Sequence, residues 1–406
     1  MSFMPKGWKS ALLSDVAEIK GGLAKGKDRN GLALRSVPYL RVANVQQRYL
    51  DLSEILRIEA TESEIRDLAL ERGDVLLNEG GDRDKLGRGW VWEGRIPLCI
   101  HQNHVFRARP RSDLVDPYYL SYWANTEQAQ NYFIKTGKQT TNLASISKTN
   151  LSNLSVPLPP LPEQRRIAAI LGQAEALRAK RRAALAKLDT IAQSIFIEMF
   201  GDPVTNPKGW TIIPLADFVT EVTNGLTRRR NDSVAGTDIV LRLRDIRSDW
   251  IDFSGVNRIT LTSDESNRFQ VSTNDLLFIR VNGNPDYVGR CALFRGFTEP
   301  VYFNDHIMRV RLDEAQVTGA FLCFVLNGTH GKKEIALHRK TSAGQHTINQ
   351  EGLRRIRIPV PTLSLQYEFE RRVAATLRLK ASHRIDLNHL DALFASLQHL
   401  AFRGEL

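Results

Sequence analysis

The chain repeats itself at a fixed offset, and this feature limits what it can fold into more than any other. Matching landmarks lie 202 residues apart, or 201 apart in a middle stretch. They are Gly7-Trp8 with Gly209-Trp210, Leu40-Arg41 with Leu241-Arg242, Asp74 with Asp275, Gly87-Arg88 with Gly289-Arg290, His104 with His306, and Gln164 with Gln366. Chance does not hold a register over so many landmarks. The 406 residues are therefore a duplicated unit of about half that length.

Each copy begins with a region of mixed α and β character. Short β-type runs such as Pro38–Val42 and Leu276–Ile279 alternate with turn signals, and a helical stretch follows near Pro117–Phe133 and near Gln316–Leu337. The pattern predicts an α+β fold with two pseudo-symmetric domains, each followed by a long helix. The predicted segments are a first domain over 1–157, a first long helix over 158–202, a second domain over 203–359 and a second long helix over 360–406.

The boundaries of the long helices carry ordinary start and stop signals. Pro162-Glu163 suits a helix start, since proline has a helical φ and a carboxylate is favoured at the positive end of the dipole. Gly201 suits the end. The second helix is predicted from Ser364 or Leu365 to Gly404. A helix of about 38 residues spans roughly 57 Å.

Both helices show a seven-residue apolar pattern, which favours an antiparallel coiled coil between them over two unrelated surface helices. The candidate a and d positions of the first helix are Ile167, Ile170, Ala174, Leu177, Arg181, Ala184, Leu188, Ile191 and Ile195. Those of the second are Phe369, Arg372, Thr376, Leu379, His383, Asp386, Leu390, Leu393, Leu397 and Leu400.

The pattern is interrupted in the middle of both helices. Arg181 occupies an a position, its repeat mate is His383, and Asp386 takes the next d position. We expect a polar layer at the pseudo-dyad, in which Arg181 faces His383 and reaches Asp386. The alternative is that Arg181 extends to solvent and the layer is only tolerated.

The composition indicates what kind of partner the chain has and where it is found. The formal net charge of +11 is typical of proteins with a polyanionic partner, although many basic proteins bind no nucleic acid. No apolar run is long enough for a bilayer, Met1–Ser10 does not look like a secretory signal, and the three cysteines are scattered. These features predict a cytoplasmic protein without a membrane partner.

Two similar domains held apart by two helices suit two separated half-sites on double-stranded DNA. The halves differ in sequence, so the half-sites should differ too. Base edges are read by Arg, Lys, Asn and Gln donors, and polar loops occupy matching places in both copies. The candidate DNA-binding residues are Lys25, Lys27, Arg29, Arg35, Arg41, Asn44, Asn78, Arg83, Lys85, Arg88, Lys138, Gln139, Thr140, Asn142, Arg228, Arg229, Arg230, Arg242, Arg244, Arg280, Asn282, Asn284, Arg290, Lys340, Gln345 and His346. For each one, a solvated loop side chain is the competing interpretation.

Three stretches resemble a known family. Leu158–Leu171 (LPPLPEQRRIAAIL) looks like the central conserved region of the specificity subunit of type I restriction–modification enzymes. Leu400–Leu406 resembles the end of its distal region, and Pro5–Lys9 resembles the start of one of its target-recognition domains. The second copy departs from the pattern, because Pro359–Tyr367 lacks the Pro-Glu pair at the helix start.

The resemblance implies an asymmetric bipartite DNA target, with one half-site read by each target-recognition domain and a spacing set by the helices. It also implies two modification (methyltransferase) subunits docked around the helices, and motor-nuclease restriction subunits in the full complex. N6-adenine methylation and ATP-dependent cleavage would belong to those partners, with S-adenosylmethionine, ATP and Mg bound there and no cofactor on this chain. A stand-alone bipartite DNA-binding regulator is the alternative. A docking subunit needs a second helix surface, for which the candidates are Arg166, Ala169, Gln173, Ala176, Ala183, Ala186 and Lys187.

Each stretch that resembles a catalytic or metal-binding motif lacks a required residue, so we expect the chain to have no enzyme activity and no metal site. Gly21–Lys27 matches the start of a P-loop, but Asp28 stands where a Mg-binding Ser or Thr is required. Cys99, His101 and His104 cluster in sequence, yet a structural zinc needs four convergent ligands. Structural histidines are the favoured interpretation. An unrecognised nuclease remains a third class of function, which the missing acidic cluster disfavours.

Overall fold

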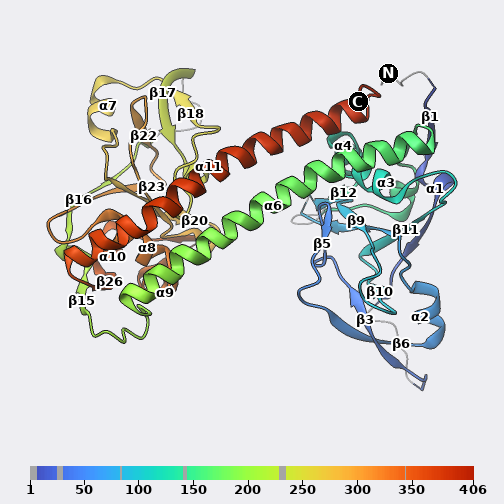
Figure 1. Ribbon diagram of the computed structural model, residues 1–406, viewed down its shortest axis with the longest axis horizontal. Coiled ribbons are helices and arrows are strands. Elements are labelled where there is room, and N and C mark those ends of the chain that lie inside the picture. Colours follow the sequence, from blue (N-terminus) through green and yellow to red (C-terminus); the bar gives the residue numbers. More distant parts are fainter. Residues whose placement is uncertain (1–6, 25–30, 83–84, 140–143, 228–234, 343) are drawn as a thin grey trace. The chain divides into compact units, whose positions relative to one another are not determined.

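The computed structural model describes residues 7–24, 31–82, 85–139, 144–227, 235–342 and 344–406. The chain divides into two compact units, one made of residues 1–183 and 384–406 and the other of residues 184–383. Each unit holds one α+β domain with parts of two long helices, α6 (Leu161–Phe200) in green and α11 (Leu363–Ala401) in red in Figure 1. None of the helices in the described ranges has the length and apolarity that a bilayer span requires.

The first domain is built on a four-stranded antiparallel sheet with smaller sheets around it. The strands of the main sheet, in spatial order, are β2 (Ala17–Gly21), β11 (Val105–Pro110), β7 (Val75–Asn78) and β9 (Gly89–Val91). The others are β10 (Ile100–His101), β3 (Arg35–Leu40) and β6 (Leu56–Ala60); β8 (Gly80–Gly81), β13 (Ala144–Ser145) and β12 (Lys138–Gln139); β4 (Val45–Gln46) with β5 (Tyr49–Leu50); and β1 (Lys9–Leu12) with β14 (Ser155–Leu158). The helices are α1 (Leu13–Val16), α2 (Glu62–Leu68), α3 (Pro117–Ala124), α4 (Glu127–Thr136) and α5 (Lys148–Ser152).

The second domain repeats this arrangement. Its main sheet is β16 (Val219–Asn224), β23 (Ile307–Leu312), β19 (Leu276–Ile279) and β21 (Cys291–Leu293). The smaller sheets are β18 (Asn257–Ile259), β17 (Ala235–Leu241) and β22 (Val301–Phe303); β20 (Val281–Asn282), β25 (Gln345–Thr347) and β24 (Lys340–Ser342); and β15 (Thr211–Pro214) with β26 (Arg357–Val360). Its helices are α7 (Ser263–Phe269), α8 (Gly319–Asn327), α9 (Thr329–His338) and α10 (Gln350–Arg355). The repeat in the sequence is therefore a repeat of two similar mixed α and β domains.

Each single helical stretch expected from the sequence is in fact a pair of helices. In the first domain the break falls at Asn125, and Thr126 caps the next helix, its Oγ1 accepting a hydrogen bond from the backbone N of Ala129 at 3.2 Å. In the second domain Gly328 separates α8 from α9. A capping hydroxyl or a glycine offers the backbone a better alternative than helix continuation at these points.

Within each unit the two long helices run antiparallel to each other. In the first unit Arg178 of α6 pairs with Asp391 of α11, and Arg181 pairs with Asp386. Residue numbers increase along α6 in the direction in which they decrease along α11, so the helices are antiparallel. In the second unit Asp189 of α6 pairs with Lys380 of α11, and Glu198 pairs with Arg372, which again gives an antiparallel pair. Helix α6 ends where expected, before Gly201 with φ +77°. Helix α11 ends at Ala401, three residues short of the predicted Gly404.

The side chains at the predicted a positions are all buried or half-buried, but at four of the predicted d positions the buried side chain is the one that follows in the sequence. Leu177 is 51% exposed, Ile191 47%, Leu379 48% and Leu393 47%. The residues that follow them are Arg178, Ala192, Lys380 and Phe394, and all four are buried. The heptad assignment had Leu177 and Leu379 at these places, and a buried charged side chain such as Arg178 or Lys380 is rare unless it is paired. Both are paired here, as described below.

The long helices also complete the core of each domain. Ile167, Leu171 and Phe394 belong to the apolar core of the first domain, and Phe196 and Phe369 to that of the second. The first and last strands of each domain pair next to a long helix, β1 with β14 and β15 with β26. Each domain is thereby closed at the point where its helix begins.

Candidate nucleic-acid interface

Two loop regions that the sequence marks as polar meet in one small sheet in each domain. In the second domain β20 follows the buried strand β19, and it pairs with β25 of the hairpin that follows α9. In the first domain β8 and the hairpin β12–β13 make the equivalent sheet. We call these two sheets the first and second polar sheet. Loops about 60 residues apart in the sequence thus form one surface in each domain.

The second polar sheet carries a row of hydrogen-bonding side chains. Asn282 lies opposite His346, and His346 lies opposite Thr341. Because directly opposed residues of antiparallel strands share a face, these side chains lie together on one face. The Nδ1 of His346 lies 2.8 Å from the Oγ1 of Thr341. An amide, an imidazole and a hydroxyl are the groups that hydrogen-bond base edges and phosphates. Thr341 is not among the predicted contacts, because its only signal in the sequence is its place in a polar stretch.

Each polar sheet also presents an exposed lysine at the same place. Lys138 begins β12, Lys340 begins β24, and the two are 202 residues apart. Both side chains are exposed, as is Gln345 in the hairpin of the second sheet. A mobile ammonium at the rim of such a sheet suits a phosphate, which it contacts as a point charge.

Three of the predicted arginines of the second domain donate to backbone carbonyls. Arg242 and Arg244 both donate to the carbonyl O of Gly255, at 2.8 and 2.6 Å, and Arg280 donates to that of Asp305 at 2.9 Å. Their guanidinium groups are therefore oriented before any ligand binds.

Two other candidates of that domain are held by neighbouring residues. The guanidinium of Arg290 lies 4.1 Å from the ring centre of Tyr287, a cation–π contact. Exposed Asn284 follows β20 and is tied to it, because its backbone N donates to the Oδ1 of Asn282 at 2.8 Å. The backbone of Asn284 is thereby held at β20, and the guanidinium of Arg290 is held over Tyr287.

Three predicted cations of the first domain are paired with exposed carboxylates. The pairs are Arg35–Glu62, Arg41–Glu54 and Lys85–Asp82. Exposed pairs of this kind contribute little to stability, so a DNA phosphate can replace the carboxylate at small cost. Arg88 of the same domain is partly buried beside β9.

Two predicted DNA contacts are wrong. Asn44 is 3% exposed, and its Nδ2 donates to the carbonyl O atoms of Asp51 and Glu54 at 2.8 and 2.9 Å. Asn78 is 0% exposed, and its Nδ2 donates to the carbonyl O of Val45 at 2.8 Å. Both amides hold the backbone inside the domain, where DNA does not reach them.

Several candidates lie outside the described residues, and they remain predictions. They are Lys25, Lys27, Arg29, Arg83, Thr140, Asn142, Arg228, Arg229 and Arg230. For Gln139 the structure describes the backbone, which belongs to β12.

The Cys99–His104 cluster is structural in this fold. His101 is fully buried, its Nδ1 lies 2.7 Å from the carbonyl O of Val105, and burial lowers its pKa to about 4. Burial also raises the pKa of the Cys99 thiol to about 12. His104 pairs with Glu79 at 2.8 Å. Across the described ranges, no three His, Cys, Asp or Glu side chains converge as metal ligands.

Gly22, within the P-loop-like stretch, has a packing role. A Cβ added at Gly22 would lie 2.1 Å from the carbonyl O of His101, and one added at Gly225 would lie 2.2 Å from that of Asn304. Only glycine allows this close backbone approach, which occurs in both domains.

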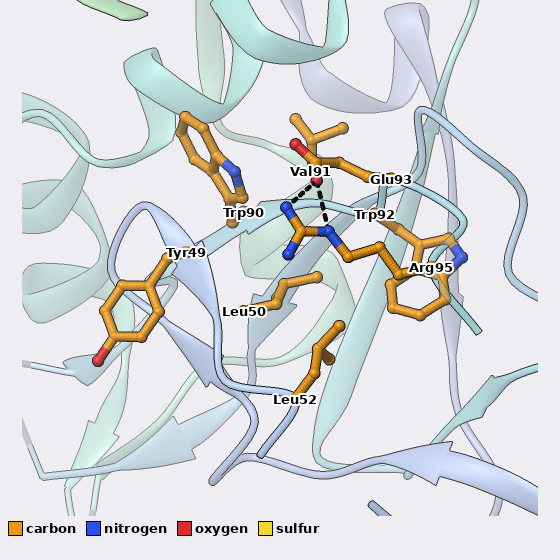
Figure 2. Close-up of a pocket in the computed structure, with 8 residues that line it drawn as sticks. All are labelled: Tyr49, Leu50, Leu52, Trp90, Val91, Trp92, Glu93 and Arg95. Atoms are coloured by element: carbon orange, nitrogen blue, oxygen red, sulfur yellow. Dashed lines mark hydrogen bonds and ion pairs between the residues drawn. The ribbon is translucent and has the colours of Figure 1, made fainter. Parts of the chain in front are cut away.

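Figure 2 shows a pocket of about 110 Å³ in the first domain. Its lining residues are Tyr49, Leu50, Leu52, Trp90, Val91, Trp92, Glu93 and Arg95. Arg95 turns back to Glu93, with Nη2 2.6 Å from Oε2. The repeat mates of Leu52 and Arg95 are Phe253 and Phe297, whose rings stack with centres 4.0 Å apart. Two residues that line the pocket in the first domain thus correspond to a stacked aromatic pair in the second.

The duplicated α+β fold with a polar sheet in each copy defines a two-domain recognition protein. A family model described as "Type I restriction modification DNA specificity domain" matches residues 5–187 and 207–371, and the chain belongs to this family.

Named relatives agree with this assignment. The chain is 26% identical to the type I restriction enzyme StySPI specificity subunit of Salmonella potsdam, over 99% of this chain and 90% of that one. It is 22% identical to the EcoKI specificity subunit of Escherichia coli K12, with the same shares covered. A crystal structure of the type I restriction-modification S subunit from M. genitalium matches with a TM-score of 0.54 at 11% identity, covering 99% of this chain and 97% of that one. That structure supports the shared fold.

Proposed function

We propose that this chain is the DNA-reading subunit of a type I restriction–modification complex, with an asymmetric bipartite target. Each domain reads one half-site of double-stranded DNA, and the long helices, acting as a coiled coil, set the spacing between them. The observation that carries this proposal is the pair of polar sheets at equivalent places in two domains of different sequence. Different side chains on equivalent surfaces read different bases in equivalent grooves.

The partners we propose are two modification subunits and the motor-nuclease restriction subunits. Support comes from the outer faces of the long helices. The seven residues named as a docking surface, Arg166 to Lys187, are all exposed. Leu177 and Leu379, 202 residues apart, add exposed apolar side chains at equivalent places on the two helices, as do Ile191 and Leu393. Exposed apolar groups that recur with the repeat favour a docked partner over a stand-alone regulator.

In this proposal the chemistry belongs to the partners. The modification subunits would bind S-adenosylmethionine and methylate adenine at N6, and the restriction subunits would use ATP and Mg to cut. This chain would bind DNA in the cytoplasm without modifying or cutting it, and without a cofactor of its own.

The experiment is a domain exchange in the assembled complex. The chain is produced with type I modification subunits in cells without other adenine methylation, and methylated adenines are mapped across the genome. Exchange of residues 8–157 for another recognition domain should change one half of the mapped target and leave the other half intact. A change in both halves contradicts the assignment of one reader to each domain. Methyl transfer by the rigorously purified chain alone contradicts the division of labour.

A further inference from the structure

The first domain meets its long helices through a buried charged contact. Arg48 lies in the turn between β4 and β5, with φ +66°, and its side chain is 16% exposed. Its Nε lies 3.2 Å from the Oε2 of Glu175 on α6. Glu175 is 19% exposed, so this is an ion pair largely removed from water. A domain loop and a helix are joined here by opposite charges.

The same carboxylate leads on to the other long helix. The Nη1 of Arg178 donates to the Oε2 of Glu175 at 2.5 Å, and its Nε donates to the Oδ1 of Asp391 on α11 at 2.5 Å. The guanidinium groups of Arg48 and Arg178 each lie 4.6 Å from the ring centre of Phe394. We call Arg48, Glu175, Arg178 and Asp391 the first joint.

The second domain has a joint at the equivalent place. Lys380 of α11 is 4% exposed, and its Nζ lies 2.5 Å from the Oδ1 of Asp189 on α6. The same ammonium donates to the Oδ2 of Asp249, in the loop that precedes Ile251 of the second domain. We call Lys380, Asp189 and Asp249 the second joint.

The repeat relates the two joints residue by residue. Arg178 is equivalent to Lys380 and Asp391 to Asp189, each 202 residues apart, so the helix-to-helix ion pair keeps its polarity. In the stretch with the offset of 201, the equivalent of Arg48 is Asp249. The first domain therefore contributes a cation, Arg48, to the first joint, and the second domain contributes an anion, Asp249, to the second joint.

The helix position that receives the charge of the domain also differs between the two joints. Glu175, which receives Arg48, is equivalent to Leu377. A domain with an arginine at the second joint would face Lys380 without the carboxylate that Glu175 supplies in the first. Two cations at a buried site with too few carboxylates are strongly disfavoured. A built-in repulsion of this kind is how proteins reject a wrong arrangement.

We propose that Arg48 and Asp249 are positioning residues that assign each recognition domain to its own half of the long helices and hold it there in one orientation. The proposal rests on the proposed function, because a fixed orientation matters for a reader that must meet its half-site at a set spacing. Neither residue lies in the polar sheets, so the half-site sequences should not depend on them.

The experiment uses the full-length chain and the target mapped with its modification subunits. The probes are duplexes with that target at its native spacer and with one base pair added or removed. The variants are Asp249→Arg, the double replacement Asp249→Arg with Leu377→Glu, which copies the first joint, and Asp264→Arg, the same charge change at an exposed site of α7. Duplex binding is measured by fluorescence anisotropy.

We expect the wild type and Asp264→Arg to prefer the native spacer by at least about tenfold, the size of a typical base-pair mismatch penalty. Asp249→Arg should lose most of this preference while the methylated half-sites stay the same, and Leu377→Glu should restore it. Should Asp249→Arg fail to fold, Asp249→Asn is measured in its place, with the same loss expected. An unchanged spacer preference in a folded Asp249 variant overturns the proposal, as does a double variant no better than Asp249→Arg. A wild-type chain that directs no methylation and prefers no duplex refutes the proposed function instead.

Discussion

The amide of Gln164 in the first unit and the amide of Gln366 in the second make the same set of hydrogen bonds. The Oε1 of Gln164 accepts from the backbone N of Asp116 at 2.9 Å, and its Nε2 donates to the carbonyl O atoms of Pro159 and Leu114 at 2.9 and 3.0 Å. The side chain is 1% exposed. One amide thus ties the start of α6 to the loop that precedes α3.

Gln366 does this in the second unit with the equivalent partners. Its Oε1 accepts from the backbone N of Thr318 at 2.8 Å, and its Nε2 donates to the carbonyl O of Pro361 at 2.9 Å and of Gln316 at 3.4 Å. It is fully buried. The proline–glutamine spacing that recurs in both copies is therefore a requirement of the fold.

Replacement of either glutamine by leucine should destabilise its unit. Gln164→Leu leaves one backbone N–H and two carbonyl groups without their partner. A group of this kind costs up to about 1–3 kcal/mol when it is fully buried. We expect a loss of about 2–4 kcal/mol in the free energy of unfolding, and a similar loss for Gln366→Leu. Denaturant titration followed by circular dichroism measures it. Gln173→Leu, at an exposed site of α6, is the control. Equal stability of Gln164→Leu and the control would refute the role of the amide.

His101 should make the first domain sensitive to mild acid. Its folded pKa of about 4, lowered by burial, lies below the ordinary value near 6.5. The unfolded chain therefore binds a proton that the folded chain does not, and stability is lost as the pH falls from about 6.5 towards 4. The slope should approach 1.4 kcal/mol per pH unit, about one proton. The repeat mate is Phe303, so His101→Phe is the matched variant, and it should lack this component. Identical pH slopes for the two chains would contradict the assignment.

Much of this fold could be predicted from the sequence, because the two copies of the repeat can be compared with each other. Landmarks at a constant offset identify the two domains and both long helices, whose ends agree within three residues. The burial of Arg178 and Lys380 was missed for a physical reason. Both are buried because carboxylates on the opposite helix, Asp391 and Asp189, compensate their charge. Charge compensation depends on neighbours in space, which periodicity along one helix does not show.

The site was predictable as a set of polar places, but not as a surface. The pairing of β20 with β25 joins residues 282 and 346, and nothing in either loop specifies the other as its partner. Polar identity also says nothing about burial. Asn44 looks like a base-reading amide in the sequence, yet its side chain is buried and donates to the carbonyl groups of Asp51 and Glu54. A buried amide and a DNA-reading amide differ only in what surrounds them.

The exposed positions on the long helices predict a partner contact without a stability role. Leu177→Lys and Leu379→Lys should each change the free energy of unfolding by less than about 0.5 kcal/mol, since both side chains are half exposed. Both should weaken association with modification subunits, as measured by size-exclusion chromatography of the mixture. Leu171→Lys, at a fully buried site, should instead unfold the first unit. Normal association of both exposed variants would exclude this surface as the docking site.

The lysines of the polar sheets should contribute to DNA affinity without contributing to sequence choice. Lys340→Ala should lower the slope of log K against log salt by about 0.9, the value for one phosphate contact, and leave the mapped target unchanged. Lys138→Ala should act in the same way through the first domain. His346→Ala should instead relax the second half-site alone. The control is Lys333→Ala on α9, also exposed. An unchanged salt slope in Lys340→Ala would exclude a phosphate contact there.

The polar layer predicted for the middle of the helices can be tested through Arg181. Its Nη2 lies 3.3 Å from the Oδ2 of Asp386, and the two side chains are 30% and 42% exposed. A partly exposed ion pair contributes at most about 1 kcal/mol, so leucine in its place should stabilise the helices by apolar burial. A polar a position also fixes helix register. The double replacement Arg181→Leu with His383→Leu should therefore raise the melting temperature and blur the spacer preference on the mapped target. A more heat-stable variant with an equally strict spacer would show that the layer is only tolerated, and that register is set elsewhere along the helices.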